Sequence, residues 1–217
     1  MKPKQIPVGR SGLTVFEMLI VVIIVALVTA VVVLPELARR KSLSAFVSCD
    51  NNLKAVGLSF RTYASDQNDR YPSKVPEADG GAKQAALDGN LARIFQVMSN
   101  ELSVPKTVIC PADQRIAATN WNRLGVAQLS YFVGLDAVDT RPNIFMLGDR
   151  DLAEGGRLLS GTVNLTTNRP VVWHKLLHKE GGNVVLADGS VQQSTTKLLR
   201  RLLANTGDAT NRVLFPQ

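Results

Sequence analysis

The chain has 217 residues, of which 45% are hydrophobic and 20% charged, a balance that excludes a disordered or collagen-like chain. Its 25 lysines and arginines exceed its 18 acidic residues and give a net charge of +7, while aromatic residues make up only 6%. Because no basic stripe is interleaved with aromatic side chains, we expect no nucleic-acid partner. The length accommodates one ordinary domain with an N-terminal appendage.

An apolar run from Leu13 to Leu34 follows the basic residues Lys2, Lys4 and Arg10. As a helix this run is about 33 Å long, which matches the hydrocarbon core of a bilayer. No A-x-A cleavage site follows it, so the run is not a conventional secretory signal. We predict a single-pass helix over residues 13–34 in the lipid of the inner membrane, with the N-terminus in the cytoplasm.

One acidic residue, Glu17, lies within this apolar run. A carboxylate in a bilayer core costs on the order of 3 kcal/mol, and no Lys, Arg or His lies near it in the segment. We therefore predict that its partner is a cation on another copy, namely an α-amino group freed by proteolysis shortly before Glu17, where Gly12 supplies a small residue. In the alternative, the chain is a plain anchor and Glu17 lies at the level of the lipid headgroups.

The residues Gly12 to Leu19, GLTVFEML, resemble the type IV prepilin leader, with Leu13 at the position where Phe is usual. The resemblance implies that a prepilin peptidase cleaves after Gly12 and that the new N-terminus at Leu13 is methylated. It also implies that Glu17 is the acid at the fifth mature position and that other pilin-like subunits are partners. In a filament, the Glu17 carboxylate would pair with the terminal ammonium of a neighbouring subunit.

Beyond the membrane, the helix is expected to continue through Pro35 over residues 35–64, because apolar residues keep a helical spacing there. Residues 65–217 are predicted to form an extracytoplasmic α+β domain, periplasmic or, after assembly, extracellular. Helices are expected at 91–102 and 196–204. Strands are expected at 107–109, 129–133, 144–147, 171–173, 183–187 and 190–192, the last two joined by an Asp188-Gly189 hairpin.

The predicted fold class is therefore α+β: a long N-terminal α-helix, transmembrane in its first half, packed on a small antiparallel β-sheet as in pilins. Three further segments, Cys49–Leu58, Tyr71-Pro72 and Cys110–Asp113, resemble pseudopilin-like proteins. His178, nine residues and then Asp188-Gly189 are similar to the H-x(9)-D-G element that names their processing-associated domain. We expect His178 to hydrogen-bond the Asp188 hairpin and to fix that loop.

The two cysteines, Cys49 and Cys110, would both lie outside the cytoplasmic membrane, where a disulfide persists. They are either bonded to each other or present as two partly buried thiols, and the sequence leaves both alternatives open. A nucleophilic Cys110 assisted by His178 has no recognisable local signature. We expect no catalytic residue and no enzymatic activity.

Two metal sites are alternatives to the expectation that the chain holds no metal and no cofactor. His174 and His178 would share a helix face and could hold zinc, but Lys175 occupies the place of a metalloprotease Glu and residues 171–173 read as a strand. Calcium could bind loop carboxylates whose spacing does not match an EF-hand loop. These carboxylates are Asp136, Asp139, Asp149 and Asp151.

The function implied by these resemblances is that of a pilin-like subunit, processed by prepilin peptidase and assembled into a type II secretion pseudopilus or a type IV pilus. The alternative from another class is a non-assembling, single-pass module anchored in the membrane that captures an extracytoplasmic ligand.

Overall fold

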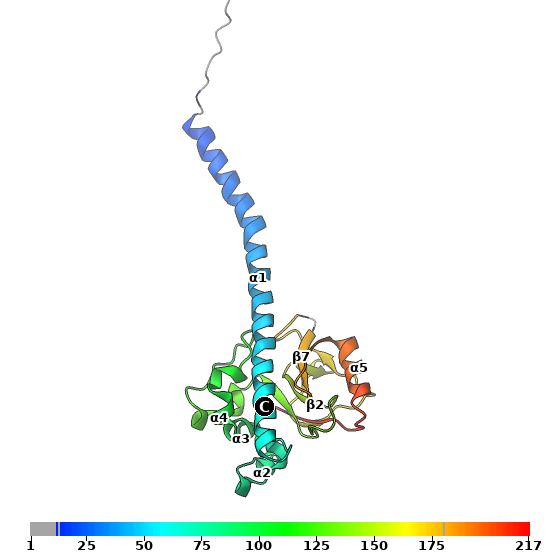
Figure 1. Cartoon of the computed structure of the whole chain (residues 1–217). Coiled ribbons are helices and arrows are strands. Elements are labelled where there is room, and N and C mark those ends of the chain that lie inside the picture. Colours follow the sequence, from blue (N-terminus) through cyan, green and yellow to red (C-terminus); the bar gives the residue numbers. More distant parts are fainter. Residues whose placement is uncertain (1–11, 13, 180) are drawn as a thin grey trace, which may run out of the picture. The chain divides into compact units, whose positions relative to one another are not determined.

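The computed structural model of the protein describes residue 12, residues 14–179 and residues 181–217. The leader residues 1–11 and Leu13, on which the predicted cleavage depends, lie outside the described residues. The chain divides into two units, Met1–Leu43 and Ser44–Gln217, which we call the N-terminal and C-terminal units and describe separately. Helix α1, Val15–Asp66, contributes to both (Figure 1).

In the N-terminal unit, the described part of α1 exposes apolar side chains in every direction around the helix. This part is long and apolar enough to cross a membrane, and none of its most apolar stretch is buried. A helix that is apolar on all sides needs lipid or other apolar helices around it. The predicted passage of the helix through Pro35 is confirmed, because Pro35 lies inside α1.

The C-terminal unit is built on a six-stranded sheet in the order β5-β9-β1-β2-β7-β8, in which every neighbouring pair is antiparallel. Its strands are β1 (Tyr131–Gly134), β2 (Phe145–Asp149), β5 (Gly161–Asn164), β7 (Gly181–Leu186), β8 (Val191–Thr195) and β9 (Arg212–Phe215). A smaller sheet has the order β4-β3-β6, with β3 (Leu152–Glu154), β4 (Arg157–Leu158) and β6 (Val172–Trp173). The predicted α+β class with an antiparallel sheet is confirmed.

The inner strands β1, β2 and β7 of the large sheet are buried along nearly their whole length. Since successive side chains of a strand point to opposite sides, both faces of the sheet are covered there. Val133 and Val185 face a core that includes the second half of α1. Their neighbours Phe132 and Val184 face a second core, formed with helix α5 (Thr196–Asn205) and the smaller sheet. Strands buried in this way read as continuous apolar runs, which is why the sequence revealed them without showing which face they present.

The second half of α1 packs on the sheet with one face of the helix. Its buried residues recur at helical spacing and are Cys49, Asp50, Leu53, Val56, Gly57, Ser59, Phe60, Tyr63 and Ala64. A Cβ atom at Gly57 would stand 3.0 Å from Cγ1 of Val185, so the helix approaches β7 closely at this glycine. The predicted continuation of the helix is confirmed, and the helix ends at Asp66.

Short helices link α1 to the sheet. They are the 3-10 turns η1 (Pro72–Lys74), η2 (Glu77–Asp79), η3 (Pro105–Val108), η4 (Trp121–Arg123) and η5 (Val126–Gln128), and the α-helices α2 (Lys83–Leu87), α3 (Leu91–Gln96) and α4 (Ser99–Leu102). The single helix predicted over 91–102 is wrong in one respect, because it is divided into α3 and α4. The N–H of Met98 donates to the Phe95 carbonyl at 3.2 Å, a tight turn that interrupts the α-helical pattern.

The strand expected at 107–109 is also wrong, since η3 occupies most of this segment. Pro105 presets the backbone for a helical turn, and the Thr107 hydroxyl donates to the Val104 carbonyl at 2.7 Å. The Asp188-Gly189 hairpin is confirmed between β7 and β8, with Gly189 at a φ of +85°. The Asp188 carboxylate accepts a hydrogen bond from the Ser190 N–H at 2.8 Å and closes the turn.

Candidate functional site

The start of α1 places Thr14 and Glu17 one helical turn apart. The Thr14 N–H and hydroxyl donate to Glu17 Oε2 at 2.7 and 2.9 Å, and the Glu17 N–H donates to the Thr14 hydroxyl at 3.3 Å. This reciprocal arrangement is a capping box, which satisfies backbone donors at a helix start. Glu17 therefore has a local hydrogen-bonding role in the chain, and neither of the Thr14 groups that bind it carries a charge.

A second constellation lies inside the C-terminal unit and joins four side chains that the chain order separates widely. Cys49 comes from α1, Cys110 follows η3, Asp149 ends β2 and His178 lies in the turns before β7. One donor atom from each lies within 4.8 Å of all the others. We call this set the Cys-Cys-Asp-His cluster. It is enclosed, because the first three residues are 0% exposed and His178 is 7% exposed.

Within the cluster, the Cys49 thiol donates to Asp149 Oδ1 over 3.1 Å. His178 Nε2 stands 3.5 Å from Cys110 Sγ and 3.4 Å from Asp149 Oδ2. Tyr131 places its hydroxyl 3.6 Å from Cys49 Sγ. Two sulfurs, an imidazole nitrogen and a carboxylate oxygen thus form one compact set of donor atoms.

The residues around Cys110 hold its loop in place. Nδ2 of Asn52, three positions after Cys49, donates to the Ile109 carbonyl at 2.9 Å and ties the loop to α1. The Asp113 N–H donates to the Cys110 carbonyl at 2.8 Å, closing a turn over the intervening Pro and Ala. The Asp113 carboxylate then accepts two hydrogen bonds from Arg150, at 2.7 and 2.9 Å, which fix the loop beside the end of β2.

Asp149 is oriented from a neighbouring strand. Asn183 in β7 donates its backbone N–H at 2.7 Å and its side-chain amide at 2.9 Å to Asp149 Oδ2. On the other side of the cluster, the ring of Phe46 meets the His178 ring edge-on, with centroids 4.7 Å apart. These contacts leave the carboxylate and the imidazole little freedom to turn away from the sulfurs.

The cluster shifts the pKa values of its two cysteines and its histidine. Burial, contact with Cys110 and the Asp149 charge raise the pKa of the Cys49 thiol. The hydrogen bond with Cys49 and, against burial, the one with His178 lower the pKa of Cys110 to about 6. Burial lowers the pKa of His178, but its contacts with Asp149 and Cys110 outweigh it and raise the pKa to about 10. Without a metal, these shifts favour an imidazolium at His178 beside a thiolate at Cys110.

The sequence prediction for His178 is wrong, because His178 and the Asp188 hairpin lie at opposite ends of β7. The Asp188 carbonyl instead accepts a hydrogen bond from Arg61 of α1 at 2.6 Å. The next hairpin residue inward, Ala187, offers its carbonyl to the Tyr71 hydroxyl at 3.0 Å. Tyr71 and the Asp188-Gly189 hairpin therefore meet at this end of β7. His178 lies with the cysteines at the other end of the strand.

The paired-histidine alternative for zinc is also corrected. Residues 174–179 form turns and not a helix, so His174 and His178 do not share a helix face. The four aspartates of the calcium alternative have different surroundings, except that Asp149 lies close enough to Asp151 to affect its pKa. Asp136 pairs with Arg212 at 2.6 Å, Asp139 lies 3.7 Å from Arg61, and Asp149 belongs to the cluster. Asp151 is buried, and burial together with the Asp149 charge raises its pKa to about 8.

The sequence left open whether Cys49 and Cys110 form a disulfide or remain thiols. In the structure they are two free thiols that lie together in the buried cluster. Asp149 was predicted only as a loop carboxylate, and Asn183 was not singled out. The available signal for Asp149 was its place directly after the buried run Phe145–Gly148, where an acid at a strand end faces the interior. Which loop it would meet there is a matter of tertiary structure.

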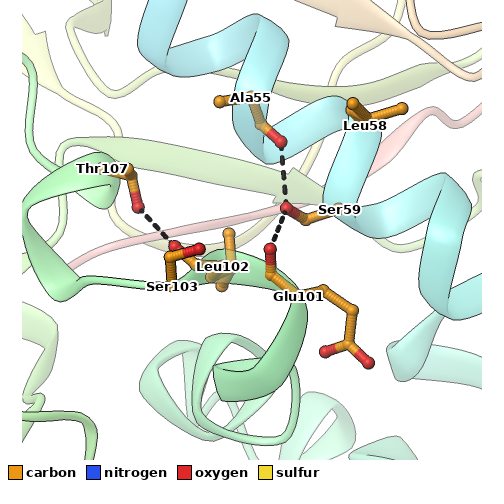
Figure 2. A pocket seen from close by; sticks show the side chains of 7 residues that line it. All are labelled: Ala55, Leu58, Ser59, Glu101, Leu102, Ser103 and Thr107. Carbon is orange, nitrogen blue, oxygen red and sulfur yellow. Dashed lines mark hydrogen bonds between the residues drawn. The ribbon is translucent and has the colours of Figure 1, made fainter.

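A small cavity of about 220 Å³ lies elsewhere in the C-terminal unit (Figure 2). It is lined by Ala55, Leu58, Ser59, Glu101, Leu102, Ser103 and Thr107. Figure 2 shows that the Ser59 hydroxyl spans it, between the carbonyls of Ala55 and Glu101 at 3.0 and 2.9 Å. The volume is below the roughly 300 Å³ at which small-molecule sites begin, and the lining contains no residue predicted as a site.

No protein-family model, no curated protein and no solved structure matches this chain.

Proposed function

We propose that the protein is a pilin-like subunit, held in the inner membrane until prepilin peptidase cuts after Gly12. It then assembles with other pilin-like subunits into a type II secretion pseudopilus or a type IV pilus-like filament. The observation that carries this proposal is the apolar surface of α1 in the N-terminal unit, which begins within a few residues of the predicted cut. Such a surface needs to be covered by lipid or by equivalent helices.

Exchange between these two surroundings is the physical basis of assembly. Lipid tails are as apolar as the Val, Ile and Leu side chains of α1, so moving the helix into a helical filament core costs little hydrophobic free energy. Apolar contacts alone do not fix the axial position of one helix relative to its neighbours, because an apolar surface packs almost equally well at many registers. A charge pair between Glu17 and a neighbour's terminal ammonium supplies one register.

The capping box provides a way to separate the charge of Glu17 from its hydrogen bonding. Glu17→Gln keeps an amide oxygen that accepts from Thr14, so the helix start is preserved while the negative charge is lost. Thr14→Val does the reverse, because it removes the hydroxyl donor and retains the carboxylate. Glu17→Ala removes both interactions.

We expect Glu17→Gln and Glu17→Ala to insert normally into the membrane and to fail in assembly. Loss of a buried charge pair costs about 3 kcal/mol, so incorporation into filaments should fall roughly a hundredfold. Thr14→Val should assemble nearly as well as the wild-type chain. The measurements are sheared filament yield by immunoblot and membrane fractionation of the same cells.

Mass spectrometry of the membrane-extracted protein tests the processing step separately. The expected mature chain begins with methylated Leu13. Assembly of Glu17→Gln at the wild-type level would contradict the charge-pair mechanism. A native chain that is both uncut and monomeric in lipid would overturn the pilin-like assignment and leave the membrane-anchored ligand-binding module as the better function.

A further inference from the structure

We propose that Cys49, Cys110, Asp149 and His178 form a structural zinc site that links four segments of the C-terminal unit. This site is independent of the proposed filament function, since it depends only on side chains buried in the C-terminal unit. It replaces the expectation that the chain holds no metal, and it differs from the His174/His178 alternative in three of its four ligands.

The distances around His178 Nε2 carry the inference. At 3.4 Å from Asp149 Oδ2, this nitrogen is farther than the usual 2.7–3.2 Å of an N–H···O bond. Ligands around a tetrahedral zinc, with Zn–S of about 2.3 Å and Zn–N of about 2.0 Å, stand about 3.3–3.8 Å from one another, and pairs that include nitrogen or oxygen stand about 3.3–3.5 Å apart. The separations of Nε2 from Asp149 Oδ2 and from Cys110 Sγ, 3.4 and 3.5 Å, are those of ligands that share one ion.

The donor set selects the metal. Two thiolates and an imidazole suit zinc, whereas calcium and magnesium take oxygen ligands almost exclusively. The fourth donor, a carboxylate oxygen, is also an accepted zinc ligand. All four ligands come from the protein and are enclosed, which is the arrangement of a structural site and leaves no position for substrate.

Residues outside the four ligands orient them as the surroundings of a metal site should. Asn183 gives Asp149 Oδ2 two hydrogen bonds, and the Tyr131 hydroxyl lies within reach of Cys49 Sγ. Arg150 and Asp113 fix the loop of Cys110. Such contacts commonly change metal affinity by about 10–100-fold when they are removed.

Metal binding is balanced by proton release. Zn²⁺ forms bonds to the sulfurs of Cys49 and Cys110 and displaces the proton of the Cys49 thiol. It also takes the lone pair of His178 Nε2, so the imidazolium that faces the Cys110 thiolate gives up a second proton. The protons pass to solvent, and no oxidant or reductant is needed.

The test uses the full-length chain in detergent, reduced, stripped with a chelator and then titrated with Zn²⁺ alone. We expect one zinc per chain by elemental analysis, and protection of both cysteines from alkylation. Replacement with Co²⁺ should produce the visible absorption of tetrahedral cobalt together with thiolate-to-cobalt charge-transfer bands. These measurements on the wild-type chain need no substitution that could impair folding.

Variants then assign the ligands. Cys110→Ser should reduce the thiolate-to-cobalt charge-transfer bands, and His178→Gln should change the tetrahedral cobalt spectrum. Neither variant should retain zinc through gel filtration. His174→Gln is the matched control, because it changes the other histidine, which lies outside the cluster, and it should bind as the wild type does. Asn183→Ala should weaken zinc binding about tenfold or more in competition with a chelator.

Three results would overturn the proposal. The first is a reduced wild-type chain that takes up no stoichiometric zinc and leaves its cysteines open to alkylation at added Zn²⁺. The second is a native protein whose mass is lower by two hydrogens because Cys49 and Cys110 form a disulfide. The third is unchanged zinc retention in folded Cys110→Ser and His178→Gln variants, which would place the metal elsewhere.

Discussion

Asp113→Ala should lower the free energy of unfolding of the C-terminal unit by about 3–5 kcal/mol, because it leaves a largely buried guanidinium without its partner. The side chains of Arg150 and Asp113 are only 12% and 2% exposed, and Nε of Arg150 lies 2.7 Å from Asp113 Oδ2. Although burial raises the pKa of Asp113, hydrogen bonds from Arg150 and Ser130 outweigh it and hold the pKa below the usual value. The carboxylate is therefore ionised at neutral pH.

Urea denaturation of the full-length chain in detergent measures this cost. The control is Glu154→Ala, which breaks an ion pair of the same 2.7 Å length with Arg169. That pair is about one third exposed, so its loss should cost no more than about 1 kcal/mol. Asp113→Ala combined with Arg150→Met should cost less than the two single changes together. Equal costs for Asp113→Ala and Glu154→Ala would contradict a buried pair.

The same pair gives stability a pH dependence of defined sign. Because the folded pKa of Asp113 is depressed, its contribution is present above the unfolded carboxyl pKa of about 3.9 and is lost as pH falls through the folded value. The wild-type chain should therefore lose stability below about pH 4. The Asp113→Ala variant has no carboxylate to protonate at this position, so its stability should fall less than that of the wild-type chain over the same acid range.

Phe60→Ala should destabilise the C-terminal unit by about 3–5 kcal/mol, the usual cost of removing a buried aromatic ring. Phe60 is 1% exposed, and its ring centroid lies 6.0 Å from that of Phe95 and 6.2 Å from that of Tyr71. The ring thus joins α1 to α3 and to Tyr71, the residue before η1. Its removal leaves a cavity between elements that have little freedom to close it.

Leu58→Ala is the matched control for Phe60→Ala, two residues away on the same helix. Leu58 is 66% exposed, so its truncation should change stability by no more than about 0.5 kcal/mol. Both changes are read by thermal and urea denaturation of the same preparation. Similar costs for the two would contradict the packing of this part of α1 on the C-terminal unit.

The features that the sequence predicts well are those that depend on residues close together in the chain, such as the spacing of apolar residues along a helix. The apolar run before Pro35 and the helical spacing of apolar residues after it predict α1, because a helix repeats its faces with one period over its whole length. Asp188-Gly189 foretells its hairpin, since a turn with a positive φ needs glycine. Short strands such as β5 and β9 were missed, because they lie at sheet positions defined by their partners and not by their own residues.

The cluster could be predicted only in part. Cys49, Cys110 and His178 were singled out as residue types, but their meeting depends on four segments brought together by the fold. Asp149 is indistinguishable by local pattern from the nearby Asp151, and only the register of β2 against β7 places it beside Asn183. His178 was given the wrong partner because proximity in sequence suggested the hairpin, whereas the extended strand between them carries the two apart.

Strand β7 and helix α1 are fastened to each other at two points, His178 to Cys49 through the cluster and Asp188 to Arg61 through a hydrogen bond. Between Cys49 and Arg61 the helix advances about 18 Å, and the strand Gly181–Leu186 covers about 20 Å. One residue inserted into β7 would reverse the faces of the side chains beyond it and detach one of the fastenings. The number of residues between His178 and Asp188 is thus matched to the number of helical residues between Cys49 and Arg61, and changing one without the other would break one of the two contacts.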